Sequence, residues 1–202
     1  LLAGMHPGGL KKCRLLYRGE IADKETKILT AVFAAGLLEN ALAEEVNLVN
    51  AELLLKQRGI DLVEETRSDM GAFRSSMSAE VITVQGQHRA TGTVFGQNMP
   101  RLVSLDDYRL EAYLDGWLLV FRHVDVPGTI GAVGTVFGQY GVNIAQMAVG
   151  RASPGGQAVG ILNLDAEPAA DALEAVRKLP AIPSAVVVQL PPAGHLPNWL
   201  QS

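Results

Sequence analysis

The segment HVDVPG at residues 123–128 carries groups that could bind a small zwitterion. A helix is expected to start at Pro127–Gly128, and the free N–H groups and positive dipole of its N-terminus would attract a carboxylate. Asp125 would attract an ammonium group, and His123 points to the same side of the preceding strand. Asn143, which follows the helix, can both donate and accept hydrogen bonds. Ordinary roles stay open for all three side chains, as a helix cap, a strand-end surface residue and a turn residue, respectively.

Basic residues in the first half of the chain form a second candidate site, for a phosphate or a carboxylate. Converging arginines can bind such an anion with two hydrogen bonds each. Arg101 and Arg109 flank an expected hairpin, and the first expected strand carries four further cations: Lys11, Lys12, Arg14 and Arg18. A solvated strand face explains the same pattern and is favoured by it alone, so anion binding is a hypothesis.

The glycines of PGTIGAVG, residues 127–134, do not form a dinucleotide site. That fingerprint requires G-x-G-x-x-G, and an acidic residue about 20 residues further on for the ribose. Here the spacing is G-x-x-G-x-x-G, and the next expected strand, Val142–Ala152, contains no acid. Gly131 and Gly134 are better explained as flat positions where the helix lies close to a sheet or to a partner helix.

Other chemistries lack the residues that they need. The four histidines, at positions 6, 88, 123 and 195, have no serine, cysteine or paired-carboxylate context, and no metal-ligand spacing is present. The single cysteine, Cys13, excludes an internal disulfide. With a net charge of −4, dispersed acids and no apolar run near the ~20 residues of a membrane span, we expect neither nucleic acid nor a membrane as partner. A cytoplasmic location is expected.

The pattern over residues 11–115 predicts a compact unit of strands and helices. A strand at Lys11–Ile21 precedes a helix over residues 24–42, for which Asp23 is the expected N-cap. A second helix ends at Gly59, a strand follows it, and residues 69–78 are expected to be a polar loop. Two hairpins complete the unit, one turning at Gly86 and one at Asp106–Asp107.

Residues 116–191 predict a second unit with the order β-α-β-β-α-β, which is the ferredoxin-like arrangement. Its expected helices are PGTIGAVGTVFGQYG and AADALEAVRKL, and a turn at Pro154–Gly156 joins the two middle strands. The predicted fold class of the whole chain is therefore α+β. Residues 1–10 are expected to be the tail of an upstream domain, since the chain begins with Leu1, and residues 192–202 a flexible tail.

The hexapeptide GTVFGQ occurs twice, at Gly92–Gln97 and at Gly134–Gln139. The first copy continues an alternating run and is expected to be a strand followed by a turn. The second lies within a period of 3.6 residues and is expected to be helical. Because the flanking patterns differ, the two copies do not indicate an internal duplication.

Three segments closely resemble the C-terminal half of the long form of D-3-phosphoglycerate dehydrogenase: VNLVNAELLLKQRGI, GTVFGQNMPRLVSLDDYRLEA and HVDVPGTIGAVGTVFGQYGVNIAQMAVGR. The resemblance extends from about Leu10 to Leu190, and H-x-D-x-P-G followed by G-V-N-I is shared by many ACT domains. It implies an α/β intervening (allosteric substrate binding) domain over residues 11–115 and a ferredoxin-like ACT domain over residues 116–191.

The same resemblance implies a regulatory role in the first step of serine biosynthesis. L-serine, or another small amino acid, would bind where two ACT domains pair edge to edge in a homo-oligomer. The family's ligands match His123, Asp125 and Asn143, with backbone around Gly128. The intervening domain would bind phosphate or a phosphorylated substrate, for which Arg101 matches a basic position and Arg109 is a second candidate.

The family's catalytic domains would lie upstream of this chain. We therefore expect no catalytic residue and no cofactor in it, with NAD bound by the catalytic domain of the parent oxidoreductase. One alternative is a stand-alone amino-acid sensor or a subunit related to serine dehydratase. Another is an ACT domain that only dimerises. A dinucleotide fingerprint upstream of Leu1 would decide in favour of the dehydrogenase.

Overall fold

The computed structural model describes residues 1–39, 46–197 and 200, and the chain divides into two compact units. The first unit comprises mainly His6–Pro100 and the second mainly Arg101–Ala193. Both contain helices and strands, so the predicted α+β class is confirmed. The last part of the first predicted helix, residues 40–42, lies outside the described residues, as do residues 198, 199, 201 and 202 of the predicted tail.

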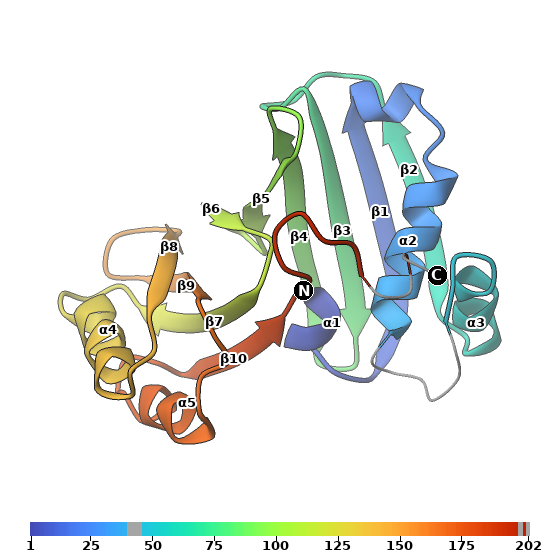
Figure 1. The fold of residues 1–202 in the computed structure, drawn as a ribbon. Helices are drawn as coiled ribbons and strands as arrows, with labels where there is room; N and C mark the ends of the chain where they lie inside the picture. Colours follow the sequence, from blue (N-terminus) through green and yellow to red (C-terminus); the bar gives the residue numbers. More distant parts are fainter. Residues whose placement is uncertain (40–45, 198–199, 201–202) are drawn as a thin grey trace. The chain divides into compact units, whose positions relative to one another are not determined.

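Four strands of the first unit lie in the order β2-β1-β3-β4. Their bounds are β1 (Leu10–Gly19), β2 (Asp61–Arg67), β3 (Ser75–Thr83) and β4 (Gly86–Phe95). β1 is parallel to β2 and antiparallel to β3, and a parallel pair needs a long crossover connection. That connection contains the short helix η1 (Glu20–Asp23), α2 (Lys27–Leu38) and α3 (Ala51–Gln57), which lie beside β1 and β2 in Figure 1.

Alternation along β1 fixes the side of the sheet that the helices cover. Cys13, Leu15 and Tyr17 are fully buried, and the Tyr17 hydroxyl lies 3.0 Å from Oγ1 of Thr30 on α2. The helices add their own apolar cluster, which includes Ala34 and Leu55. The alternate residues of β1, which include Lys12, Arg14 and Arg18, therefore point to the other face of the sheet.

Two local predictions in the first unit differ from the structure. Asp23 does not cap α2: the helix begins at Lys27, after η1, and the Asp23 carboxylate accepts a hydrogen bond of 2.9 Å from Ser68 Oγ. β3 begins at Ser75, inside the expected loop, because it pairs with β1 as far as Gly19. The expected N-terminal tail, residues 1–10, contains a one-turn helix, α1 (Leu2–Met5), in which Leu2 is buried, and its origin in an upstream domain stays a prediction.

The second unit contains the predicted β-α-β-β-α-β arrangement. Its antiparallel sheet has the order β10-β7-β9-β8. The elements are β7 (Trp117–Val124), α4 (Thr129–Gln139), β8 (Ile144–Arg151), β9 (Gln157–Leu164), α5 (Ala170–Arg177) and β10 (Ser184–Gln189). Figure 1 shows α4 beside β8 and α5 beside β10. β8 and β10 are the two edge strands of this sheet.

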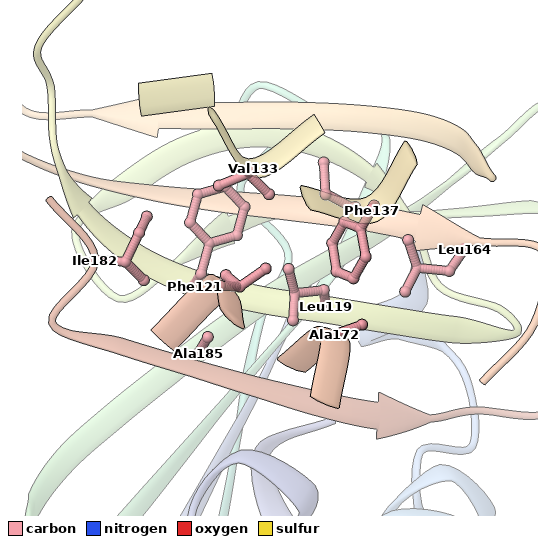
Figure 2. Close-up of a cluster of buried hydrophobic side chains, with 10 residues drawn as sticks. Leu119, Phe121, Val133, Phe137, Leu164, Ala172, Ile182 and Ala185 are labelled. Atoms are coloured by element: carbon pink, nitrogen blue, oxygen red, sulfur yellow. The ribbon is translucent and has the colours of Figure 1, made fainter. Parts of the chain in front are cut away.

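An apolar core fills the space between this sheet and the two helices (Figure 2). Phe121 from β7 and Phe137 from α4 are its largest side chains, and both are fully buried. The Phe121 ring lies on Gly160 of β9 so closely that a Cβ there would be 2.2 Å from the ring atom Cζ. Gly160 is therefore required by packing and not by backbone conformation.

A hairpin of β5 (Met99–Leu105) and β6 (Tyr108–Tyr113) packs on the sheet face opposite the helices. The backbone oxygen of Glu111 accepts a hydrogen bond of 3.1 Å from Gln146 Nε2. Asp106, in the hairpin turn at φ 50°, forms an ion pair with Arg122 of β7. Because of these contacts, the compact units divide at residues 100/101, upstream of the predicted boundary at 115/116.

The two copies of GTVFGQ adopt different structures, as predicted. The first belongs to β4 up to Phe95 and then turns at Gly96, which has a φ of 59°. The second forms the last half of α4. On α4, a Cβ at Gly131, Gly134 or Gly138 would meet no atom within 4 Å, so this glycine face does not lie on the sheet. Packing against a partner helix stays a prediction.

Among the described residues, no helix is both long enough and apolar enough to cross a membrane.

Replacing Gly160 by alanine should destabilise the second unit, because the buried Phe121 ring has no room to move away. We expect a loss of about 1–3 kcal/mol in the free energy of unfolding, measured by urea denaturation. Gly134→Ala is the matched control, and it should stabilise the protein by about 0.5–1 kcal/mol because the site is helical and open. Equal stability of Gly160→Ala and the wild type would contradict the close contact with Phe121.

Candidate functional site

The loop between β7 and α4 is held by backbone hydrogen bonds. The N–H of Asp125 donates to the Gly156 oxygen at 2.9 Å, and the N–H of Thr129 donates to the Val126 oxygen at 3.3 Å. Gly128 is the N-cap of α4, with a φ of 91°. A Cβ at Gly128 would meet no atom within 4 Å, so glycine is needed there for its backbone conformation alone. Asp125 lies outside the helix and is not its cap.

The Asp125 carboxylate is instead bound by the end of β8 and the following turn. Its Oδ2 accepts a hydrogen bond of 2.8 Å from Arg151 Nη1 and a longer one, 3.4 Å, from the N–H of Gly155. The hydrogen bond from Arg151 is the main reason that the pKa of Asp125 is lowered from its ordinary value. Asp125 is therefore a carboxylate of fixed orientation three residues before the N-cap of α4.

His123 is buried on the helix side of the sheet, with 1% of its surface exposed. Its Nδ1 lies 3.0 Å from the backbone oxygen of Val124. A carbonyl oxygen can only accept, so Nδ1 carries the proton, and Nε2 can act as an acceptor in the tautomer in which it carries none. Nε2 is buried and has no hydrogen-bond partner among the described residues. A ligand with an ammonium or hydroxyl group could supply the missing donor.

Asn143 lies at the other end of the sheet from this loop. Its Nδ2 donates to Oδ2 of Asp165 at 2.6 Å, just beyond the pairing of Ile144 with Leu164. His123, in contrast, pairs with Ala158. Six residues of β9 separate the two positions, which corresponds to about 20 Å at about 3.3 Å per residue. Within one chain, the structure therefore brings His123, Asp125 and Gly128 together but leaves Asn143 apart.

The two arginines predicted for anion binding have different surroundings. Arg101 pairs across the hairpin with Tyr113, and its guanidinium carbon lies 4.0 Å from the centre of that ring. Its Nε lies 3.7 Å from a carboxylate oxygen of Glu111. Arg109 is exposed and pairs with Ser104, towards the turn. These contacts do not bring the two guanidinium groups together, and anion binding by them stays a prediction.

Other reactive groups offer little chemistry in the described part of the chain. Burial raises the pKa of the Cys13 thiol to about 12, so the reactive thiolate is not formed at neutral pH. The described residues contain no group of three or more histidine, cysteine, aspartate or glutamate side chains that could hold a metal ion.

Arg151, which forms the ion pair with Asp125, is not among the residues that the sequence analysis singled out. In the predicted strand order, the turn at Pro154–Gly156 joins the end of the second strand to the start of the third. The start of the third strand pairs with the end of the first, as Gln157 does with Val124 in the structure. This topology alone places residue 151 near residue 125, so the predicted order of strands was sufficient to predict that the two residues are neighbours.

The chain matches two family models. Residues 1–106 match the D-3-phosphoglycerate dehydrogenase intervening domain, and residues 117–181 match the ACT domain. The two matches lie on either side of the predicted domain boundary at 115/116.

Three curated proteins similar to the chain are named D-3-phosphoglycerate dehydrogenase. It is 33% identical over 183 residues to the D-3-phosphoglycerate dehydrogenase of Methanocaldococcus jannaschii, which is 91% of this chain and 34% of that protein. It is 34% identical over 185 residues to the enzyme of Archaeoglobus fulgidus, 91% of this chain and 35% of that protein. It is 31% identical over 175 residues to the enzyme of Bacillus subtilis, and the match covers 87% of this chain and 33% of that protein. The chain thus spans about a third of the length of these relatives.

Replacing Arg151 by glutamine should raise the pKa of Asp125, because the main hydrogen bond to its charged form is lost. A group whose pKa is lowered by folding stabilises the protein above its unfolded pKa, about 3.9 for aspartate, and loses that contribution as the pH falls through the folded pKa. The stability difference between wild type and Arg151→Gln should therefore shrink in acid. Carboxyl NMR titration and urea denaturation at neutral and acid pH measure both effects. An unchanged Asp125 titration would contradict the ion pair.

Proposed function

The chain belongs to the D-3-phosphoglycerate dehydrogenase family, and we propose that it is the part of such an enzyme through which L-serine regulates activity. It consists of the intervening and ACT domains of this family. The dehydrogenase activity and its NAD would belong to the remaining two thirds of the enzyme. The observation that carries the proposal is the fixed Asp125 carboxylate, three residues before the N-cap of α4, together with a buried His123 nitrogen that has no hydrogen-bond partner among the described residues.

Each of these groups matches a part of an amino-acid ligand. Asp125 would bind the ammonium group, since its carboxyl group is charged at neutral pH and its orientation is fixed by Arg151. The N–H of Thr129 already donates to Val126, but the next N–H groups in the first turn of α4 have no acceptor within the helix and would bind the carboxylate. The Nε2 lone pair of His123 would accept from the ligand's hydroxyl or ammonium group. A hydroxyl donor at this position favours serine over glycine or alanine.

Asn143 would join the site from a second chain. β8 is an edge strand, and the residues on its helix side include the exposed apolar side chains of Met147 and Val149. Antiparallel pairing of β8 with its copy would continue the sheet across a two-fold axis. The end that bears Ile144 would then face the end that bears Arg151, so Asn143 of one chain would lie near Asp125 of the other. Serine would bind between two chains.

Regulation would follow from this geometry. A ligand that contacts both chains binds the paired arrangement more tightly than any other, so it shifts the population towards that arrangement. The catalytic domains would respond only as far as they differ between the two states. The intervening domain would bind phosphate or a phosphorylated substrate, with Arg101 and Arg109 as the candidate residues.

Asp125→Ala should abolish serine binding without unfolding the protein, because the only carboxylate proposed to bind the ammonium group is removed. Isothermal calorimetry with L-serine measures the affinity, and a thermal melt verifies the fold. Asp171→Ala, which removes an exposed acid from α5, is the matched control and should bind serine as the wild type does. Unchanged serine affinity in Asp125→Ala would show that the assignment of the site is wrong.

Met147→Lys with Val149→Lys should convert the oligomer to monomers and weaken serine binding together, since charges on an edge strand prevent edge-to-edge pairing. Light scattering after size-exclusion chromatography measures the oligomeric state. Gln189→Lys, on the other edge strand β10, is the control and should leave both properties unchanged. A monomeric double variant that binds serine with wild-type affinity would exclude a site shared between chains.

A further inference from the structure

We propose that Arg151 binds the effector's carboxylate together with the N-terminus of α4, so that the Asp125–Arg151 ion pair recognises a whole zwitterion. The inference rests on the proposed amino-acid binding. It adds the residue because of which a ligand would need a carboxylate group to bind tightly. Arg151 ends β8, and its Nη1 lies 2.8 Å from Asp125 Oδ2.

The geometry leaves hydrogen-bonding groups of both partners for a ligand. Arg151 and the N–H of Gly155 both contact Oδ2 of Asp125, so an ammonium group can bind at Oδ1 without displacing either. A guanidinium has five N–H donors in a planar fork, and the contact with Asp125 uses Nη1. The Arg151 side chain is 55% exposed, so its remaining donors are accessible to a carboxylate from solution.

The charges select for a ligand with both ionic groups. An ammonium group at Asp125 lies close to the positive guanidinium, and this repulsion is offset only when the ligand brings its own negative charge. An α-amino acid carries its ammonium and carboxylate groups a few ångströms apart, as the ion pair does. The N-terminus of α4 offers about half a unit charge, against a full charge at Arg151. Arg151 is therefore the stronger partner for the carboxylate.

The role of Arg151 differs from that of a residue that only positions Asp125. A positioning residue would affect every ligand that uses Asp125, whether or not the ligand has a carboxylate. A carboxylate ligand affects only those that have one. Two probes separate these roles: L-serine, and L-serinamide, in which a neutral amide replaces the carboxylate.

Calorimetry of the full chain with both probes tests the proposal in wild type, Arg151→Gln and Arg151→Lys. In the wild type, serine should bind at least about 10-fold more tightly than serinamide, and Arg151→Gln should lose about 10- to 100-fold in serine affinity, as expected for a hydrogen-bonded ion pair. Serinamide should bind Arg151→Gln at least as well as it binds the wild type. Arg151→Lys should recover part of the preference, because lysine keeps the charge but not the fork.

Arg67→Gln, an exposed arginine on β2, is the matched control and should leave both affinities unchanged. Circular dichroism and thermal melts show whether each variant is folded. If Arg151→Gln does not fold, the comparison of the two probes is made with Arg151→Lys. Equal losses for both probes in Arg151→Gln would overturn the proposal in favour of a positioning role. Unchanged or tighter serine binding would also overturn it. A wild type that binds neither probe would instead overturn the proposed serine site itself.

Discussion

The pairing of β7 and β8 with the same central strand, β9, is the constraint on which the candidate site depends. Val124 at the end of β7 pairs with Gln157, and Arg151 at the end of β8 pairs with Ala158. Backbone hydrogen bonds therefore place Asp125 and Arg151 at one end of the sheet, whatever their side chains do. A shift of one residue would turn every core side chain of the strand to the opposite face, including Phe121, whose ring fits only against a glycine. Core packing in this way determines the register, and the register determines the ion pair.

The surroundings of β8 restrict how a second chain could approach. On the face opposite the helices, Gln146, Ala148 and Gly150 are wholly or partly buried by the hairpin of β5 and β6. A Cβ at Gly150 would lie 2.7 Å from the backbone oxygen of Arg109, so the hairpin touches the sheet directly. On the helix face, Met147 and Val149 are exposed. The surface of β8 that is open in the described chain thus consists of its edge and two apolar side chains, which favours pairing in the plane of the sheet.

Sequence patterns predicted the elements well where one period dominated and less well where chain segments compete for contacts. The second GTVFGQ is helical because apolar residues recur around it at helical spacing, although four glycines lie between positions 128 and 138. The start of α2 was misplaced: Asp23 ends η1 and is bound by Ser68, which is distant in sequence, and α2 begins at Lys27. His123 and Asp125 were proposed as site residues from local spacing. Arg151 required the strand order, and the distance from Asn143 to Asp125 within one chain became visible only from the register of β9.

Two-fold pairing of β8 would create two equivalent sites, one at each end of the paired strands. The first serine to bind would bear the free-energy cost of bringing the two edges together. The second serine would bind to edges that are already paired. The two binding events would therefore be coupled with positive sign through the assembly, without any change inside either sheet. Linkage requires the same coupling in reverse, so that whatever stabilises the paired edges, including the catalytic domains of the enzyme, would tighten serine binding by the same factor. The serine affinity of a site shared between chains would therefore depend on how the chains are arranged.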